Sequence, residues 1–242
     1  MKKIFIAIAA IAVLASCDKE ASFKTLKFTA KVDNTETKAT LGDKETKYGV
    51  DIYPVVWEEG DEILVTANNG AASAVFTLSS GAGETDGTFA YTGTDVTEDM
   101  SNYVYTYPVG RTGVDTVQVA AAAGKVPAGA MFLTAKSSSY EQEPLFNKRS
   151  ALVRVKVTTS TAVENADIVL YDYLHTKFVD GEYKPASYRL TNCNLAAGTT
   201  EFLMGVDANT MIDVVRVNDV KKNSPEEILC SGSSITTINF AL

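Results

Sequence analysis

The sequence predicts an all-β protein of two β-sandwich domains in tandem behind a cleaved signal peptide. About a dozen short segments rich in β-branched and aromatic residues run along the chain, with turn-forming residues roughly every 8 to 12 positions. Several of these segments alternate strictly between apolar and polar residues, as half-buried strands do. The one helix-friendly run, Ala120 to Ala123, is cut short by Gly124 and Pro127.

Residues 1–16 have the order of an export signal. Lys2 and Lys3 precede an apolar run from Ile4 to Leu14, which is too short for a membrane-spanning helix of about 20 residues. Cys17 follows small residues directly, where a thiol can be joined to a diacylglycerol before cleavage, and Leu14-Ala15-Ser16-Cys17 resembles the lipobox of a bacterial lipoprotein. We therefore expect lipidation at Cys17; the alternative is an ordinary signal peptide whose cleavage site abuts a cysteine.

Charge argues against two classes of partner. The 242-residue chain carries a net charge of −8, and loss of Lys2 and Lys3 leaves 20 basic against 30 acidic residues, or −10. Without a basic cluster, such a chain is poorly suited to nucleic acid or to an anionic bilayer. Membrane association is therefore expected from lipid alone, since two or more acyl chains such as palmitate hold firmly.

The mature chain is expected to begin with a polar tether, residues 17–25. Leu26 to Val32 then alternates as a half-buried strand with one wet face. Asp33 to Tyr48 is polar, rich in Thr and Lys and without apolar periodicity, which predicts an exposed loop. Loops of this length inside compact domains are usually functional or mobile.

The most distinctive block runs from Val55 to Val65. Two β-rich runs flank Glu58-Glu59-Gly60-Asp61, where glycine supplies a positive φ and the aspartate can bond its own backbone, so we expect a turn. Trp57, the single tryptophan, is expected to fill a core or cover a sheet edge. The alternative role for Trp57 is a platform for a ligand.

A change of composition at Tyr140 to Pro144 predicts the domain boundary. The N-terminal domain is then expected to span 26–143 and the C-terminal domain 144–242, and the 97 residues from 146 to 242 suit one sandwich of around 100 residues. Further strands are expected in 73–78, 87–91, 102–107, 114–119, 130–135, 151–157, 166–171, 187–190, 201–204, 211–217 and 235–242.

With Cys17 carrying lipid, Cys193 and Cys230 are the two remaining thiols. In an oxidising compartment they could form a disulfide, and two separately buried thiols are the equal alternative. No C-x-x-C spacing is present for zinc or redox chemistry.

Catalytic motifs are absent from the sequence. His175 is the only histidine, and no G-x-S-x-G or H-E-x-x-H pattern occurs. Glu58-Glu59 and Glu226-Glu227 are adjacent, and neighbours in a strand point to opposite faces, so they make no carboxylate pair. We expect no enzyme activity, no cofactor and no metal.

Tyrosines are plentiful and cluster in two places. They could form an aromatic platform for sugar rings, or they could simply occupy half-buried strand faces, where tyrosine is common. The residues concerned are Tyr103, Tyr105, Tyr107, Tyr171, Tyr173, Tyr183 and Tyr188.

Taken in order, these blocks resemble the fimbrillin-like lipoproteins of Bacteroidetes over most of the mature chain. The resemblance rests on the lipobox, the Phe28-Thr29-Ala30 strand, the Thr-Lys-rich loop that ends at Trp57 to Asp61, Gly87-Thr88-Phe89, Tyr105 to Pro108, and Phe146 to Val153. It implies two transthyretin-like β-sandwich domains and membership in pilus shafts, tips or anchors. Polymerising members are cut in the loop after the first strand, and the vacated groove accepts a strand from a neighbour.

In this chain the strand to be removed would be Leu26 to Val32, and Ile238, Phe240 and Leu242 alternate as a donor strand. Family processing follows an arginine, whereas no arginine precedes Arg111 here. Either Lys38, Lys44 and Lys47 serve a lysine-preferring protease, or the subunit is never cut and stays as an anchor.

We therefore expect a lipid-anchored, fimbrillin-like protein of the outer membrane with a structural or adhesive role. Its partners would be other fimbrial subunits or its own copies, and a host or polysaccharide ligand. The acidic tether resembles surface-export signals and favours the cell surface over the periplasm. The alternative is a non-polymerising, glycan-binding surface lipoprotein of a nutrient-uptake system, and a glycoside hydrolase ranks third.

Overall fold

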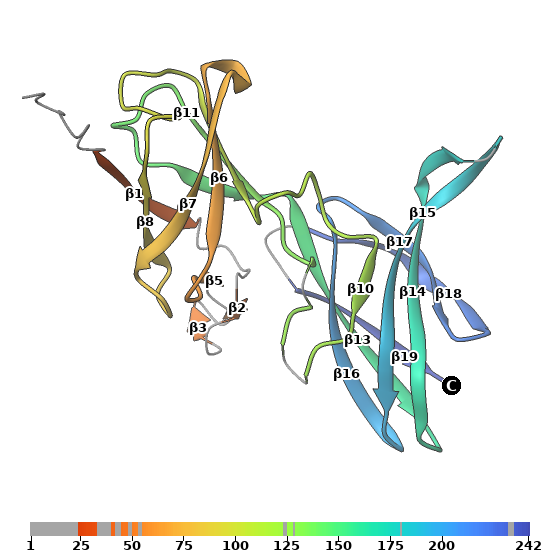
Figure 1. Cartoon of the computed structure of the whole chain (residues 1–242). Coiled ribbons are helices and arrows are strands. Elements are labelled where there is room, and N and C mark those ends of the chain that lie inside the picture. Colours follow the sequence, from red (N-terminus) through yellow and green to blue (C-terminus); the bar gives the residue numbers. More distant parts are fainter. Residues whose placement is uncertain are drawn as a thin grey trace, which may run out of the picture.

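The computed structural model describes residues 24–32, 40–41, 45–47, 50–52, 55–122, 125–127, 129–179, 181–231 and 235–242. Within these ranges the regular structure is β-strand, apart from one 3₁₀ turn, η1 (Asn68–Gly70). The all-β prediction is confirmed. Two groups of strands, each with its own hydrophobic core, lie next to each other (Figure 1).

The first group closes into a seven-stranded barrel, on the left in Figure 1. Its pairing order is β1 (Thr25–Val32), β12 (Leu145–Lys148), β11 (Leu133–Ser137), β9 (Tyr103–Tyr107), β6 (Glu62–Ala67), β7 (Ala72–Ser80) and β8 (Asp86–Thr92). The ring closes because β1 pairs with β12 on one edge and with β8 on the other. This part is therefore a closed ring, where the sequence predicted two separate sheets.

Aromatic rings fill the barrel. Trp57 is fully buried and meets Phe89, Tyr107 and Phe146 edge to face, with ring centroids 4.9, 5.4 and 5.8 Å apart. Such perpendicular contacts let the positive ring edge meet the negative face. Trp57 thus has the core role that we expected, and as a fully buried side chain it offers no ligand platform.

The turn before β6 has the predicted chemistry. Gly60 has φ +85°, the Asp61 N–H donates to the Glu58 carbonyl at 3.0 Å, and Asp61 Oδ2 accepts the Glu58 N–H at 2.8 Å. The Tyr107 hydroxyl donates to Asp61 Oδ1 at 2.9 Å. This carboxylate therefore joins the turn to β9.

The second group consists of two sheets around a separate core. The five-stranded sheet has the order β10 (Val117–Val119), β15 (Glu182–Leu195), β14 (Val163–Val179), β17 (Met211–Val217) and β18 (Val220–Leu229). The three-stranded sheet has the order β16 (Gly198–Asp207), β13 (Ser150–Thr159) and β19 (Ile235–Ala241). Apolar side chains of both sheets share this core, as in a β-sandwich.

The predicted boundary between residues 143 and 144 does not follow the strand pairing. β12 lies beyond that boundary yet belongs to the barrel, and β10 lies before it yet pairs in parallel with β15. The two groups also pack closely, because a Cβ added to Gly205 would lie 2.1 Å from the Ala130 carbonyl oxygen. Local composition marks a loop at 140–144, and the partner of the next strand depends on long-range pairing.

Part of the predicted Asp33 to Tyr48 loop is paired. β2 (Thr40–Leu41) pairs with β5 (Val55–Val56), and β3 (Glu45–Lys47) pairs with β4 (Val50–Ile52). These strands have two or three residues each, too few for an alternating pattern to be recognised in the sequence. The loop assignment was therefore wrong for 40–41 and 45–47.

Candidate functional site

The first strand, β1, is the segment that the resemblance singles out, and it is an integral part of the barrel. It pairs antiparallel with β8 through seven residue pairs, from Thr25 opposite Thr92 to Lys31 opposite Asp86. On its other edge Lys31 and Val32 pair in parallel with Leu145 and Phe146. The predicted strand Leu26 to Val32 is therefore confirmed, and it has neighbours on both sides.

Alternate side chains of β1 enter the core as the sequence predicts. Leu26, Phe28 and Ala30 are 3%, 7% and 0% exposed. The Phe28 ring lies 5.0 Å from Tyr105, 5.2 Å from Phe76 and 5.8 Å from Phe89, centroid to centroid. Burial of a Leu or Phe side chain contributes about 1.5–3 kcal/mol each, so the inward face of β1 is strongly held.

The groove that holds β1 differs along its length in the size of side chain that it can accept. Ala30 lies opposite Gly87, and a Cβ added to Gly87 would be 2.5 Å from Trp57 Cδ1. The groove therefore accepts large side chains at the positions of Leu26 and Phe28 and a small one at Ala30. A strand that replaces β1 with Phe240 at the Phe28 position would place Leu242 or Ile238 at the Ala30 position and overpack it.

An ion pair ties β1 to the segment before β12. Lys31 Nζ donates to Glu143 Oε2 at 2.7 Å, and the Lys31 N–H donates to the Pro144 carbonyl at 3.3 Å. The hydrogen bond and charge of Glu143 raise the pKa of Lys31 above its ordinary value. Lys24, at the start of the strand, pairs with Glu98. Sequence reasoning missed both pairs, since nothing local signals a partner 112 or 74 residues away.

The predicted lipidation and processing residues are only partly described. Cys17, Lys38 and Lys44 lie outside the described residues. Lys47 is the last residue of β3, where its backbone pairs with Val50. The assignments of Cys17 to lipidation and of the three lysines to processing stay predictions.

The predicted donor strand completes the chain's own sandwich. β19 pairs in parallel with β13 through seven residue pairs, from Leu152 opposite Ile235 to Thr158 opposite Ala241. Ile238 and Phe240 are 6% and 5% exposed within the second core, whereas Leu242 is 42% exposed. Donation to a neighbour would therefore require β19 to leave its own core.

Cys193 and Cys230 are both free and both buried in the second core. Their thiols face different carbonyl groups, since Cys193 Sγ lies 3.6 Å from the Leu190 oxygen and Cys230 Sγ lies 3.9 Å from the Ile228 oxygen. Burial raises the pKa of each thiol to about 12. In the part of the chain that the structure describes, Cys193 and Cys230 are therefore two separate buried thiols, which agrees with the second alternative and not with a disulfide.

The tyrosines divide into core and surface residues. Tyr103 and Tyr105 are fully buried in the barrel, and Tyr188 is buried in the second core with its hydroxyl on Asp207. The platform interpretation is wrong for these three. Tyr171 and Tyr173, on β14, lie at the surface, and Tyr173 is 42% exposed.

Among the side chains that the structure describes, the remaining chemical candidates give no acid–base pair. His175 lies in β14, and its side chain is outside the described part of the chain. The pKa of Asp61 is raised above its ordinary value, because the effect of burial exceeds the opposite effect of the hydrogen bonds from the Glu58 N–H and Tyr107. This carboxylate stabilises the turn before β6. Over the described ranges no three His, Cys, Asp or Glu side chains gather as a metal site. No helix in those ranges has the length and hydropathy needed to cross a bilayer.

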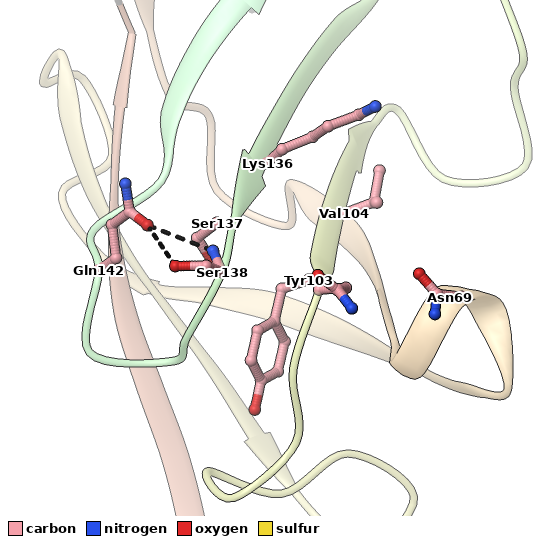
Figure 2. Close-up of a pocket in the computed structure, with 8 residues that line it drawn as sticks. Asn69, Tyr103, Val104, Lys136, Ser137, Ser138 and Gln142 are labelled. Carbon is pink, nitrogen blue, oxygen red and sulfur yellow. Dashed lines mark hydrogen bonds between the residues drawn. The ribbon is translucent and has the colours of Figure 1, made fainter.

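A polar pocket of about 380 Å³ lies at the end of the barrel near η1. Figure 2 shows Gln142 on one side, with its side-chain oxygen bonded to the Ser138 N–H at 3.2 Å and to the Ser138 hydroxyl at 3.4 Å, and Asn69 on the other. The lining residues are Asn69, Asn102, Tyr103, Val104, Lys136, Ser137, Ser138 and Gln142, none of them a carboxylate or a histidine. This pocket offers hydrogen bonds to a polar ligand.

No protein-family model matches the chain, and no curated protein matches it. Among solved structures, a candidate cell adhesion protein from Bacteroides ovatus is 15% identical over 90% of this chain and 92% of its own, with a TM-score of 0.46. One from Bacteroides fragilis is 12% identical over 88% and 92%, with a TM-score of 0.37. The major pilin of Streptococcus pyogenes is 10% identical over 91% and 97%, with a TM-score of 0.23. Similarities at this level carry no conclusion about function.

Proposed function

We propose that the protein is a lipid-anchored, fimbrillin-like surface protein with a structural or adhesive role, and that it keeps its first strand. The lipobox at Leu14 to Cys17 supports the anchor, and the all-β chain behind it fits a structural module. The observation that carries the proposal is that β1 is paired on both edges while β19 completes its own sandwich. Both strands that subunit assembly would exchange are thus paired within the same chain. This arrangement suits an anchor better than a polymerising shaft subunit.

The lack of arginine before Arg111 supports the same proposal, because family processing follows an arginine. Without a cut, β1 stays in its groove and the lipid stays attached to the folded chain. The protein would then hold a fimbria, or a ligand, at the outer surface of the cell.

Replacement of Cys17 by alanine in cells tests the anchor. We expect the wild-type chain in the membrane fraction and the Cys17→Ala chain in the soluble fraction, because no other membrane attachment is proposed. A Cys193→Ala chain is the matched control and should remain with the membranes. Membrane retention of Cys17→Ala would refute the lipid anchor.

A second candidate function is that of a non-polymerising, glycan-binding surface lipoprotein. The specific observation in its favour is the pair of surface tyrosines on β14, whose rings lie 6.2 Å apart beside Lys221. The two candidates share the anchor and differ in whether the folded monomer binds a saccharide.

A further inference from the structure

The outer face of the five-stranded sheet carries tyrosine rings and basic side chains close together. Ile168 and Leu170 of β14, with Val215 and Val217 of β17, point into the second core. Side chains alternate between faces along a strand, so Tyr171 and Arg216 lie on the outer face. β14, β17 and β18 are neighbours in this sheet (Figure 1), and Lys221 of β18 is directly opposite Arg216.

Four residues of this face form what we call the tyrosine–cation cluster: Tyr171, Tyr173, Arg216 and Lys221. Lys221 Nζ lies 5.7 Å from the Tyr171 ring centroid and 5.6 Å from that of Tyr173. Arg216 Cζ lies 6.0 Å from the Tyr171 centroid. Lys221 Nζ also donates to the Tyr173 hydroxyl at 3.1 Å. The cations and rings are thus held together on one surface.

The two cations have no carboxylate partner among the described residues. Two acidic side chains of β14 and β17 are engaged elsewhere: Asp213 Oδ2 accepts the Tyr173 N–H at 3.0 Å, and Asp167 Oδ2 lies 3.9 Å from Arg189 Nη1. Arg216 Nε is buried and has no hydrogen-bond partner. Like charges directly opposite each other destabilise an antiparallel pair, so Arg216 and Lys221 leave a cost that a bound anion would offset.

We propose that the tyrosine–cation cluster binds an acidic saccharide. A guanidinium fork and an ammonium group at directly opposite positions of β17 and β18 match one carboxylate or sulfate, because charge-assisted hydrogen bonds to arginine are directional and strong. The exposed Tyr173 ring offers an apolar face of the size of a pyranose ring. The chain as a whole has a net charge of −8, which opposes binding of long, densely charged polyanions such as nucleic acid and favours a short acidic sugar.

This inference rests on the glycan-binding candidate and specifies its ligand class and its site. The test uses the detergent-solubilised mature chain and measures by calorimetry its affinity for galacturonic acid oligomers and for neutral maltose oligomers of equal length. Tyr173→Ala and Lys221→Gln alter exposed side chains, so both variants should fold, which circular dichroism checks. Lys125→Gln, at an exposed lysine between β10 and β11 that lines no pocket described above, has the same change of charge and is the matched control.

We expect the wild type and Lys125→Gln to bind the acidic oligomers with equal affinity and to bind more weakly as salt is added. Tyr173→Ala and Lys221→Gln should each weaken binding by about tenfold or more, because the first removes the ring that faces the sugar and the second removes a charged hydrogen-bond donor. Unchanged binding in both variants, or equal binding of the neutral oligomers, would overturn the site and leave glycan binding standing. Absence of binding to either sugar would overturn both.

Discussion

Lys31 and Glu143 form an ion pair, Nζ to Oε2 at 2.7 Å, that joins the first strand of the barrel to the segment entering β12. The pair spans 112 residues of sequence and closes the ring where β1 meets β12 in parallel. Both side chains are largely exposed, at 44% and 57%, so the pair fixes register more than it adds stability. The strength of β1 in its groove comes from its inward face.

Substitution of Phe28 by alanine tests that inward face. Because the ring packs against Phe76, Phe89 and Tyr105, we expect Phe28→Ala to lower the free energy of unfolding by about 3–5 kcal/mol. Urea denaturation measures the change. Thr29→Ala, one residue further along on the partly exposed face, should stay within about 0.5 kcal/mol of wild type. Equal effects of the two substitutions would show that β1 is not packed as described.

Replacement of Phe240 by alanine asks whether β19 belongs to its own chain. In the isolated monomer Phe240→Ala should cost about 3–5 kcal/mol, because the ring is buried in the second core. Asn239→Ala, an exposed neighbour on the same strand, is the control. If the Phe240→Ala monomer is as stable as the wild type, β19 does not stabilise the core of its own chain and could pair with a neighbouring subunit instead.

Gly87 lets the Trp57 ring pack directly against the backbone of β8. Since an added Cβ would lie 2.5 Å from Trp57 Cδ1 and 2.8 Å from Leu78 Cδ1, Gly87→Ala should destabilise the barrel by about 1–3 kcal/mol. The emission spectrum of the single tryptophan should shift at the same time. Gly113, where the nearest atom to an added Cβ is 3.7 Å away, provides the control Gly113→Ala with near-native behaviour. A native-like Gly87→Ala chain would contradict the close Trp57 contact.

The fold was predictable where the signal is local. The alternation of Leu26, Phe28 and Ala30 identified β1, and Gly60 with Asp61 identified the turn before β6. β18 was missed because Lys221, Lys222 and Asn223 interrupt its apolar pattern. Sequence reasoning missed Lys221 in the tyrosine–cation cluster for the same reason. Asn218, at φ +49°, starts the two-residue turn between β17 and β18, and asparagine tolerates this left-handed conformation.

Long-range relationships were not predictable. Nothing near β10 or β12 indicates which sheet each joins, so the boundary at 143/144 disagreed with the pairing. The separation of Cys193 from Cys230 likewise depends on where two strands place their thiols in one core. Closure of the barrel required β1 to meet a strand more than a hundred residues away, for which a single sequence carries no signal.

The two buried thiols predict a loss of stability at high pH. Their pKa values rise from an ordinary 9.0 to about 12 on folding, so the unfolded chain ionises first. The free energy of unfolding should hold below pH 9 and fall between pH 9 and 12, by about 1.4 kcal/mol per pH unit for each thiol. Denaturation at several pH values should show a shallower fall for Cys193→Ala. An identical slope would argue against a neutral, buried thiol at this position.

The central claim, that the chain keeps both its lipid and its first strand, is tested most directly by the N-terminal residue of the mature protein purified from cells. Mass spectrometry of the N-terminal peptide identifies that residue and any attached acyl groups. We predict Cys17 carrying a diacylglycerol, with Leu26 to Val32 present in the same chain. A mature protein that begins at Ala39, Glu45 or Tyr48, directly after Lys38, Lys44 or Lys47, would contradict the claim and identify a processed subunit.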